Sequence, residues 1–145
     1  MKTFLMLLLM TAGLATQAQF RKIPSEVTDS FKTRFPDANK VSWKDRVVYF
    51  QAEFVVGEQM QRANFSTEGN WLKTEKVVAF EKLPAEVKDG FKKSKYADWS
   101  VKEVVETNSV ENGNEYRITI RKDEILKRNL RFSPSGQLQD DSLTL

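Results

Sequence analysis

The side chains available for chemistry are limited to carboxylates, lysines, tyrosines and hydroxyls, because the 145-residue chain contains neither histidine nor cysteine. Without cysteine there is no disulfide framework, no thiolate nucleophile and no cysteine-based zinc or iron–sulfur site. Without histidine there is no imidazole general base and no usual ligand set for zinc, copper or haem. These absences favour a protein that is not an enzyme and that needs no cofactor.

The remaining polar pairs are weak signals for a catalytic or metal site. Ser94-Lys95 is adjacent in sequence and so does not define a serine–lysine catalytic pair. Asp123-Glu124 and Asp140-Asp141 lack the alternating oxygen ligands of a calcium-binding loop. No glycine-rich phosphate loop is present. We therefore predict no catalytic residue and no metal ligand.

The first eighteen residues have the pattern of a secretory signal peptide. A positive Met1-Lys2 precedes the apolar run Phe4–Met10, and small residues follow as far as Ala18. The apolar run is too short to serve as a membrane anchor, which needs about 20 residues. We predict cleavage after Ala18, which leaves residues 19–145 as a periplasmic or secreted protein without a membrane anchor.

The charge of the mature chain argues against a nucleic-acid partner. The formal net charge is +3, and loss of Lys2 with the signal peptide lowers it to +2. Nonspecific nucleic-acid binding needs a more concentrated basic field. Export from the cytoplasm points the same way, so we expect no nucleic acid among the partners.

Two stretches of the mature chain match each other and predict a tandem repeat. Ile23–Lys32 and Leu83–Lys92 are identical at six of ten positions, at an offset of 60. Phe65–Gly69 matches Phe132–Gly136 at an offset of 67, and a third anchor lies between these two in the same order. Two diverged copies of one unit imply that neither copy buries its apolar face alone.

Each copy, at about 23–80 and 83–142, begins with a predicted helix. Apolar residues recur at every fourth position, which is the spacing of one helical face. Pro24 and Pro84 stand where the first helical residue would be, and a proline suits that position. The first stripe consists of Ile23, Val27, Phe31 and Phe35, before Pro36 stops the helix; the second consists of Leu83, Val87 and Phe91, with the helix ending at Tyr96.

Four antiparallel strands are expected after each helix, because apolar and polar residues alternate between turn signals. The residues predicted to face inward are Val48, Phe50, Ala52, Phe54, Val56, Ala63 and Phe65, and then Tyr116, Ile118, Ile120, Leu126, Leu130 and Phe132. The predicted fold class is α+β. It consists of one antiparallel sheet of roughly eight strands, with both helices on one face and the other face open.

These duplicated motifs resemble the secreted PepSY-like family with the β-lactamase-inhibitor-protein-like fold. The resemblance is carried by Pro24, Val27, Phe31, Phe50, Phe65, Gly69 and Leu72, and by Pro84, Val87, Phe91, Tyr116, Phe132, Gly136 and Leu138. It covers essentially the whole mature chain. The resemblance implies no catalytic motif. The family's name links it to domains proposed to restrain peptidases, and its fold links it to a protein that inhibits an enzyme by docking a concave sheet.

The open face of the sheet is the predicted docking surface. Tryptophan, tyrosine and arginine are enriched at binding hot spots, and alternation places such residues on this face. The predicted partner-binding residues are Tyr49, Gln51, Glu53, Arg62, Trp71, Lys73, Arg117, Arg121, Lys127 and Arg131, with the second half of the face basic. Two alternatives stay open: Trp71 is equally well a buried strand residue, and the lysines and arginines of this face simply keep an open sheet soluble.

We therefore predict a non-catalytic binding protein that inhibits or regulates an envelope enzyme such as a peptidase. The alternative is a periplasmic carrier of a small ligand, or a stress-related carrier, which uses the concave face or the groove between the two copies. The identity of the partner does not follow from the sequence.

Overall fold

The computed structural model describes residues 21–144, so the predicted signal peptide lies outside the described residues. The elements are α1 (Ser25–Arg34), β1 (Asn39–Asp45), β2 (Tyr49–Val56), β3 (Gln59–Ser66), β4 (Trp71–Val77), the 3-10 helix η1 (Phe80–Lys82), α2 (Ala85–Lys93), β5 (Ser100–Ser109), β6 (Gly113–Arg121), β7 (Lys127–Phe132) and β8 (Leu138–Thr144). Along residues 21–144 no helix is long and apolar enough to cross a membrane.

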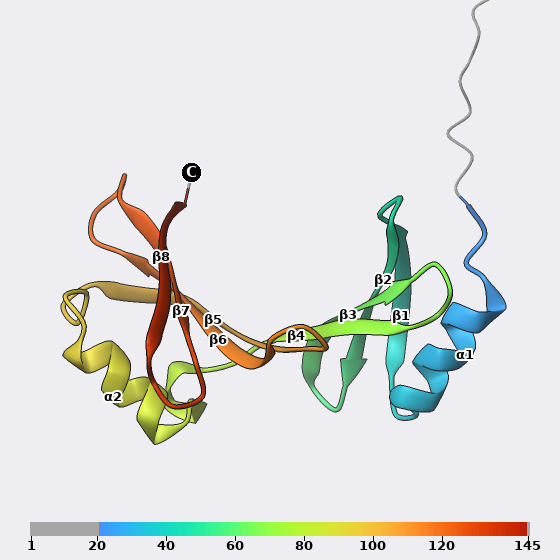
Figure 1. Ribbon diagram of the computed structural model, residues 1–145, viewed down its shortest axis with the longest axis horizontal. Helices are drawn as coiled ribbons and strands as arrows, with labels where there is room; N and C mark the ends of the chain where they lie inside the picture. The colour runs from blue at the N-terminus through green and yellow to red at the C-terminus, as the bar shows by residue number, and fades with distance from the viewer. Residues whose placement is uncertain (1–20, 145) are drawn as a thin grey trace, which may run out of the picture.

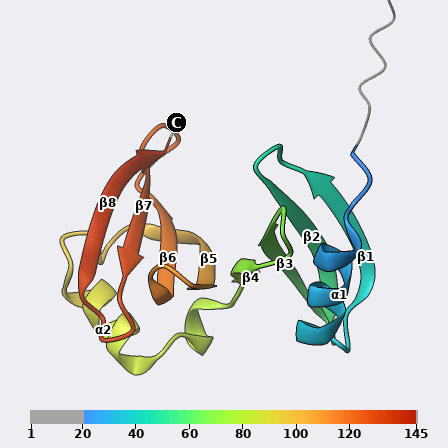
Figure 2. The ribbon, with the colours of Figure 1, turned by 45° about the vertical axis from the view of Figure 1, so that its right-hand side comes forward.

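The eight strands form one antiparallel sheet in sequential order, β1 to β8. Neighbouring strands along the chain are joined by short turns, except that η1 and α2 lie between β4 and β5. The two ends of the sheet rise on either side of a low centre, and both helices lie on the outside of this bend (Figure 1). Seen from another side, α1 lies against β1–β3 and α2 lies beside β5–β8 (Figure 2). The predicted α+β fold class is confirmed, while the tandem duplication of the sequence stays a prediction.

Both helices begin one residue later than predicted. Pro24 and Pro84 are extended residues just before the first helical turn, and their carbonyls accept the amides of Thr28 and Lys88 at 3.2 and 3.1 Å. A proline suits this boundary because its fixed φ is common to the extended and the helical regions and it has no amide hydrogen to satisfy.

The second helix ends at Lys93 and not at Tyr96. Ser94 stops it, because both its amide and its hydroxyl donate to the carbonyl of Phe91, the hydroxyl at 2.7 Å. The chain then turns, and Tyr96 enters the core from this turn.

The apolar residues form two separate cores, one under each helix. The first contains Val27, Phe31, Phe50, Ala52, Phe54, Ala63 and Phe65, and the second contains Leu83, Val87, Phe91, Tyr96, Val104, Tyr116, Ile118, Ile120, Leu130 and Phe132. Nearly all the residues predicted to face inward are in or against these cores. Val48 and Leu126 are exceptions, with 75% and 40% of their surface exposed, because both lie in turns beyond the ends of the strands.

The turn between the third and fourth strands of each half packs onto the start of that half's helix. Gly69 and Gly136 have φ of +88° and +79°, which favours glycine. A Cβ atom on Gly69 would lie 2.6 Å from the carbonyl oxygen of Glu26, and one on Gly136 would lie 2.0 Å from that of Glu86. The two turn glycines are therefore needed for both conformation and space.

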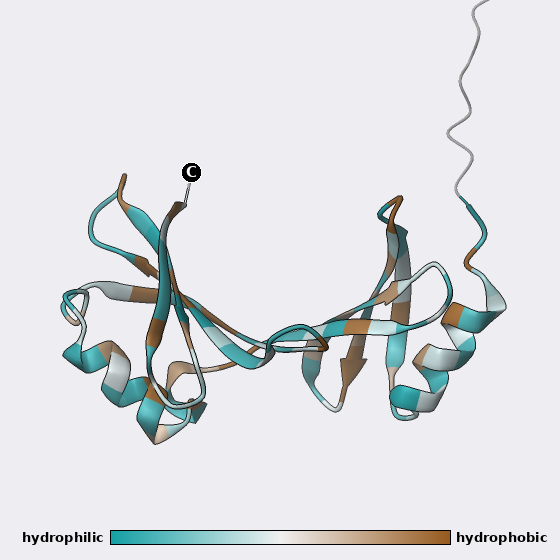
Figure 3. Ribbon diagram, viewed as in Figure 1, coloured by the Kyte–Doolittle hydropathy of each residue, from teal (hydrophilic) through white to brown (hydrophobic). Residues whose placement is uncertain are grey.

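The centre of the sheet has no helix on either face. Between the two cores its helix-side surface is polar, as the 3.1 Å ion pair of Lys76 with Glu106 shows. In Figure 3 hydrophilic residues (teal) and hydrophobic residues (brown) both occur along the central strands. The two halves are therefore joined by strand pairing between β4 and β5 and not by a shared core.

Candidate functional site

Strand register determines which side chains share the open face. Gln51 is opposite Asn64, which is opposite Lys73. The neighbouring row runs Glu53, Arg62, Glu75, Thr107 and Glu115. Extended to the other strands, the register places nine of the ten predicted docking residues here: Tyr49, Gln51, Glu53, Arg62, Lys73, Arg117, Arg121, Lys127 and Arg131.

Trp71 is the exception, and its assignment to the open face is wrong. Alternation from Lys73 would place Trp71 on the open face, but a β-bulge brings it opposite Phe65, a core residue. The indole packs against the first core, lies under the Arg34 guanidinium at 3.6 Å, and donates from Nε1 to Thr74 Oγ1 at 2.9 Å. The buried alternative is therefore the one the structure supports.

Charged side chains on the first half of the open face are paired with one another. Glu53 accepts from Lys44 Nζ at 2.9 Å and lies 3.5 Å from Arg62 Nε. Lys73 pairs with Glu75 at 2.8 Å. The hydrogen bond from Lys44 lowers the pKa of Glu53 below its ordinary value, although partial burial opposes the shift. Glu53 therefore stays ionised at neutral pH.

A buried amide pair supports this first half from below. Gln51 and Asn64 are both buried although they point to the open side of the sheet. Gln51 Nε2 donates to Asn64 Oδ1 at 3.0 Å, and Arg46 reaches over from the β1–β2 turn to donate to Gln51 Oε1 at 3.1 Å. Because each partner orients the next, this part of the surface is preorganised.

Cations on the second half are less fully paired. Among residues 21–144, Arg117, Arg121, Lys127 and Arg131 make no ion pair within 4 Å. Arg117 and Arg131 lie directly opposite each other, an arrangement in which like charges repel. These arginines are therefore available to a partner.

The second half of the face is mixed in charge and not simply basic as predicted. Glu103, Glu115 and Asp140 lie on it with the four cations. Alternation with Tyr116 is sufficient to place Glu115. Asp140 is two residues from Leu138, so alternation alone would place both side chains on the same face. A bulge between them turns the Asp140 side chain to the open side.

Arginine and lysine are distributed differently over the molecule. Five of the eight arginines belong to the open face: Arg46, Arg62, Arg117, Arg121 and Arg131. Of the fourteen lysines in residues 21–144, register assigns only three to it: Lys44, Lys73 and Lys127. This separation matters because protein interfaces are enriched in arginine and depleted of lysine.

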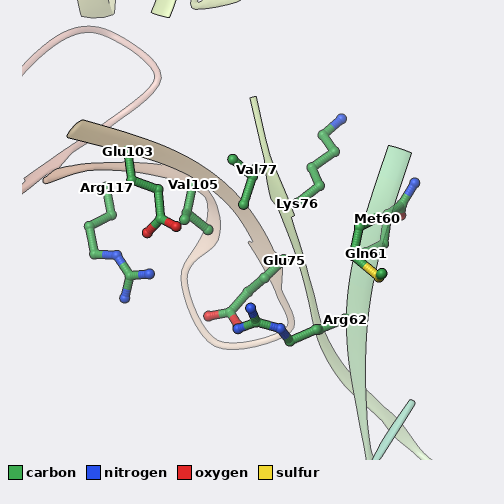
Figure 4. A pocket seen from close by; sticks show the side chains of 9 residues that line it. All are labelled: Met60, Gln61, Arg62, Glu75, Lys76, Val77, Glu103, Val105 and Arg117. Carbon is green, nitrogen blue, oxygen red and sulfur yellow. The ribbon is translucent and has the colours of Figure 1, made fainter. Parts of the chain in front are cut away.

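Apolar side chains come to the surface at the centre of the open face. Met60 and Val77 are 56% and 49% exposed, and Val105, opposite Val77 on β5, is 5% exposed. They line a small hollow of about 40 Å³ together with Arg62, Glu75, Glu103 and Arg117 (Figure 4). A second, wider hollow of about 500 Å³ on the same face is polar and includes Lys73, Arg117 and Arg131. Sequence reasoning missed Met60 and Val77 as site residues because an isolated exposed aliphatic carries no motif.

No metal centre is evident in the region from Arg21 to Thr144, where no three carboxylates are grouped so that they could hold an ion. The perturbed carboxylates are instead held by protein donors. A bidentate contact from Arg21, at 2.7 and 2.6 Å, lowers the pKa of Asp45 to about 2. The Tyr96 hydroxyl, followed by Arg128 and Lys95, lowers the pKa of Asp141. Both contacts tie strands to neighbouring segments and point to structural roles.

Comparisons with known proteins agree with this geometry. The model of the family described as "Putative beta-lactamase-inhibitor-like, PepSY-like" matches residues 46–140. A BLIP-like protein from Bacteroides fragilis is 26% identical with a TM-score of 0.80, and the match covers 86% of this chain and 89% of that one. A DUF2874 family protein from Bacteroides ovatus is 25% identical with a TM-score of 0.80, again over 86% and 89%.

One further solved structure shares the fold alone. It is a "putative periplasmic" protein from Bacteroides eggerthii, 22% identical with a TM-score of 0.78, over 85% of this chain and 90% of that one. Among curated proteins none matches the sequence significantly.

Proposed function

Because the chain belongs to the beta-lactamase-inhibitor-like, PepSY-like family, we propose that it is an exported, non-catalytic protein that docks a protein partner through the open face of its sheet. The family supports an inhibitor-like role without catalysis. The periplasmic description of the Bacteroides eggerthii protein, which shares the fold, is in keeping with the compartment predicted for this chain.

The observation that carries the proposal is the concentration of arginine on the open face. Solubility alone would be served at least as well by lysine, whose ammonium group is more strongly hydrated. Arginine presents a planar fork of donors that matches carboxylates and backbone carbonyls, and it is enriched at hot spots. Five of eight arginines and three of fourteen described lysines on this face therefore favour a binding surface.

The size of the face suits a specific protein interface. Seven inter-strand spacings of about 4.8 Å make the sheet about 34 Å wide, and strands of about seven residues are about 24 Å long. The resulting area of about 800 Å² is what one partner of a standard interface buries. We propose that the partner is an envelope enzyme, such as a peptidase, which the docked chain inhibits or regulates.

The test is a pull-down from periplasmic extract with immobilised residues 19–145. We expect a stoichiometric partner that is lost in the double variant Arg117→Glu/Arg131→Glu, because both cations become anions. The control is Lys82→Glu/Lys92→Glu, which makes the same charge change at exposed positions on η1 and α2. Failure to bind any partner at micromolar protein and low salt, or equal loss in the control, would contradict the proposal.

The wider polar hollow of about 500 Å³ supports a second candidate function, that of a small-ligand carrier. This function predicts a molecule that purifies with the chain and raises its melting temperature on addition. Native mass spectrometry of the purified protein distinguishes the two. A ligand mass that disappears in Arg117→Glu/Arg131→Glu, without any protein partner, would favour the carrier.

A further inference from the structure

We infer that the small central hollow, formed by Met60, Val77 and Val105, receives one apolar side chain from an uncharged, extended segment of the partner. This inference rests on the proposed function, because it identifies the chemistry recognised at the centre of the same face. The hollow lies where the two halves of the molecule meet.

The three apolar residues lie in one row across neighbouring strands. Val77 on β4 is opposite Val105 on β5, and Met60 lies beside Val77 on β3. No helix covers this row, because each helix packs on the far side of the sheet and at one end of it. Val105 is nearly buried, whereas Met60 and Val77 expose about half their surface. The hollow therefore has an apolar floor and an open mouth.

The size of the hollow fits a side chain and not a larger ligand. Its volume is about 40 Å³, against about 10–15 Å³ on the same kind of measure for a single water molecule. A few water-sized volumes correspond to the branched end of a leucine or valine side chain. Displacement of water from an apolar floor favours such a side chain, because burial of apolar surface is the main favourable contribution to association.

The walls of the hollow carry two groups of opposite charge. Arg62 lies directly opposite Glu75, and Glu103 lies diagonally across from Arg117. Figure 4 shows the Arg62 and Glu75 side chains on one side of Val77 and the Arg117 and Glu103 side chains on the other. The four charges sum to zero, so a charged side chain entering the hollow meets both attraction and repulsion. An extended peptide is better matched, since its amides can donate to the glutamates and its carbonyls can accept from the arginines.

The position of the hollow agrees with the anatomy of protein interfaces. Apolar anchors concentrate near the centre of an interface, surrounded by polar contacts that exclude water. This hollow lies in the middle of the sheet, with paired charges on the first half and free cations on the second half of the face. We therefore expect the apolar anchor of the partner, and not its charged residues, to dominate affinity.

The probe for this inference is a phage-displayed library of disulfide-constrained peptides selected on the folded chain, residues 19–145. Enriched peptides are then measured against Val77→Asp, Met60→Asp and the matched control Val110→Asp. Val110 is 69% exposed in the β5–β6 turn and does not line the hollow. Both hollow variants change exposed residues, so circular dichroism is expected to show the native fold in each.

We expect enriched peptides to share one aliphatic or aromatic residue with uncharged neighbours. Their binding is expected to fall at least tenfold in Val77→Asp and Met60→Asp and less than twofold in Val110→Asp. Peptides that depend on Arg117 and Arg131 but not on Val77 would overturn the inference and leave the docking proposal standing. An absence of enriched peptides would also overturn it, and peptides indifferent to every open-face substitution would contradict both proposals.

Discussion

The two halves of the molecule place one helix across four strands with the same turn contact, yet they fill the space beneath the helix differently. The first core is aromatic: Phe31, Phe35, Trp43, Phe54 and Phe65 have ring centroids 4.6–6.2 Å apart. The centre of the second core is aliphatic, with Ile118, Ile120 and Leu130 fully buried. The arrangement of one helix on four strands therefore accepts different core residues, provided that they fill the space between the helix and the sheet.

The helix approaches its turn more closely in the second half. A Cβ atom on Gly90 of α2 would lie 1.9 Å from the carbonyl oxygen of Gly136. The first helix has Ser30 at the position that the predicted repeat aligns with Gly90. In the second half the backbone of α2 thus lies directly against the backbone of the β7–β8 turn. This contact requires glycine at position 90.

The last strand of each half is attached by different chemistry. In the first half the Trp71 indole of β4 stacks under the Arg34 guanidinium of α1, while its hydrogen bond to Thr74 stays within β4. In the second half Asp141 accepts from the Tyr96 hydroxyl and pairs with Arg128, and it lies 3.4 Å from Lys95 Nζ. An aromatic contact and a charge cluster therefore have the same structural role, and they should respond differently to acid.

The largest effect is expected from truncating one aromatic in each core. Phe65→Ala and Phe132→Ala should each lower the free energy of unfolding by about 4 kcal/mol, because each leaves a cavity. Since the cores are separate, hydrogen exchange should show lost amide protection in β1–β3 for Phe65→Ala and in β6–β8 for Phe132→Ala. Equal loss over the whole sheet in both variants would show that the halves unfold as one unit.

The next largest effect is a difference in stability between substitutions at aligned positions of α1 and α2. Gly90→Ala should lower the free energy of unfolding by about 3 kcal/mol, because the added methyl group meets a backbone carbonyl. Ser30→Ala, at the aligned position of α1, should change it by less than about 0.5 kcal/mol. Urea unfolding measures both. A small change in Gly90→Ala would mean that α2 shifts freely, contrary to the close contact.

A smaller loss of stability is expected when the contacts that attach β4 or β8 to neighbouring segments are removed. Asp141→Asn should lower the free energy of unfolding by about 2 kcal/mol, because charged hydrogen bonds are lost. Arg34→Ala removes the cation over the Trp71 indole, which is the contact between β4 and α1, and should cost about 1 kcal/mol. The same urea assay at neutral pH applies to both, and an equal loss in the two variants would remove the distinction between the two kinds of attachment.

The smallest effect is the loss of stability in acid that comes from the ion pair between Arg21 and Asp45. Because the pKa of Asp45 is about 2 in the folded chain and 3.8 without its partners, its stabilising contribution is present above about pH 4 and is lost as the pH falls toward 2. Asp141, whose pKa is also lowered, contributes with the same sign. Melting temperatures between pH 5 and pH 2 should fall less steeply in Asp45→Asn than in the wild type. An unchanged slope would show that this pair does not contribute.

Periodicity was enough to predict the helices, an antiparallel sheet of about eight strands and most of the core. The stripes of Val27 with Phe31 and of Val87 with Phe91 face the sheet as expected. Short-range rules suffice here because side-chain direction repeats every 3.6 residues in a helix and every two in a strand. The prediction of inward-facing residues was wrong at the ends of strands, where Val48 and Leu126 continue the apolar pattern but lie in exposed turns.

Alternation failed where a β-bulge inserts a residue. Bulges follow the turn glycines in both halves, one at Leu72 and one at Gln139. Beyond each bulge, the side chains point to the opposite face from the one that alternation predicts. Trp71 therefore lies on the helix side and Asp140 on the open side. A bulge has no strong signature in a single sequence, because it depends on how two strands pair.

By itself, the sequence determined the local structure of this protein: two helices that each follow a proline, glycine turns, and strands with one apolar side. It also determined the absence of histidine and cysteine chemistry. Only the tertiary structure decided which polar residues share the open face, and that Met60, Val77 and Val105 meet at its centre. The physical reason is that helices and turns depend on neighbours in the chain, whereas a surface depends on register across strands that are distant in sequence.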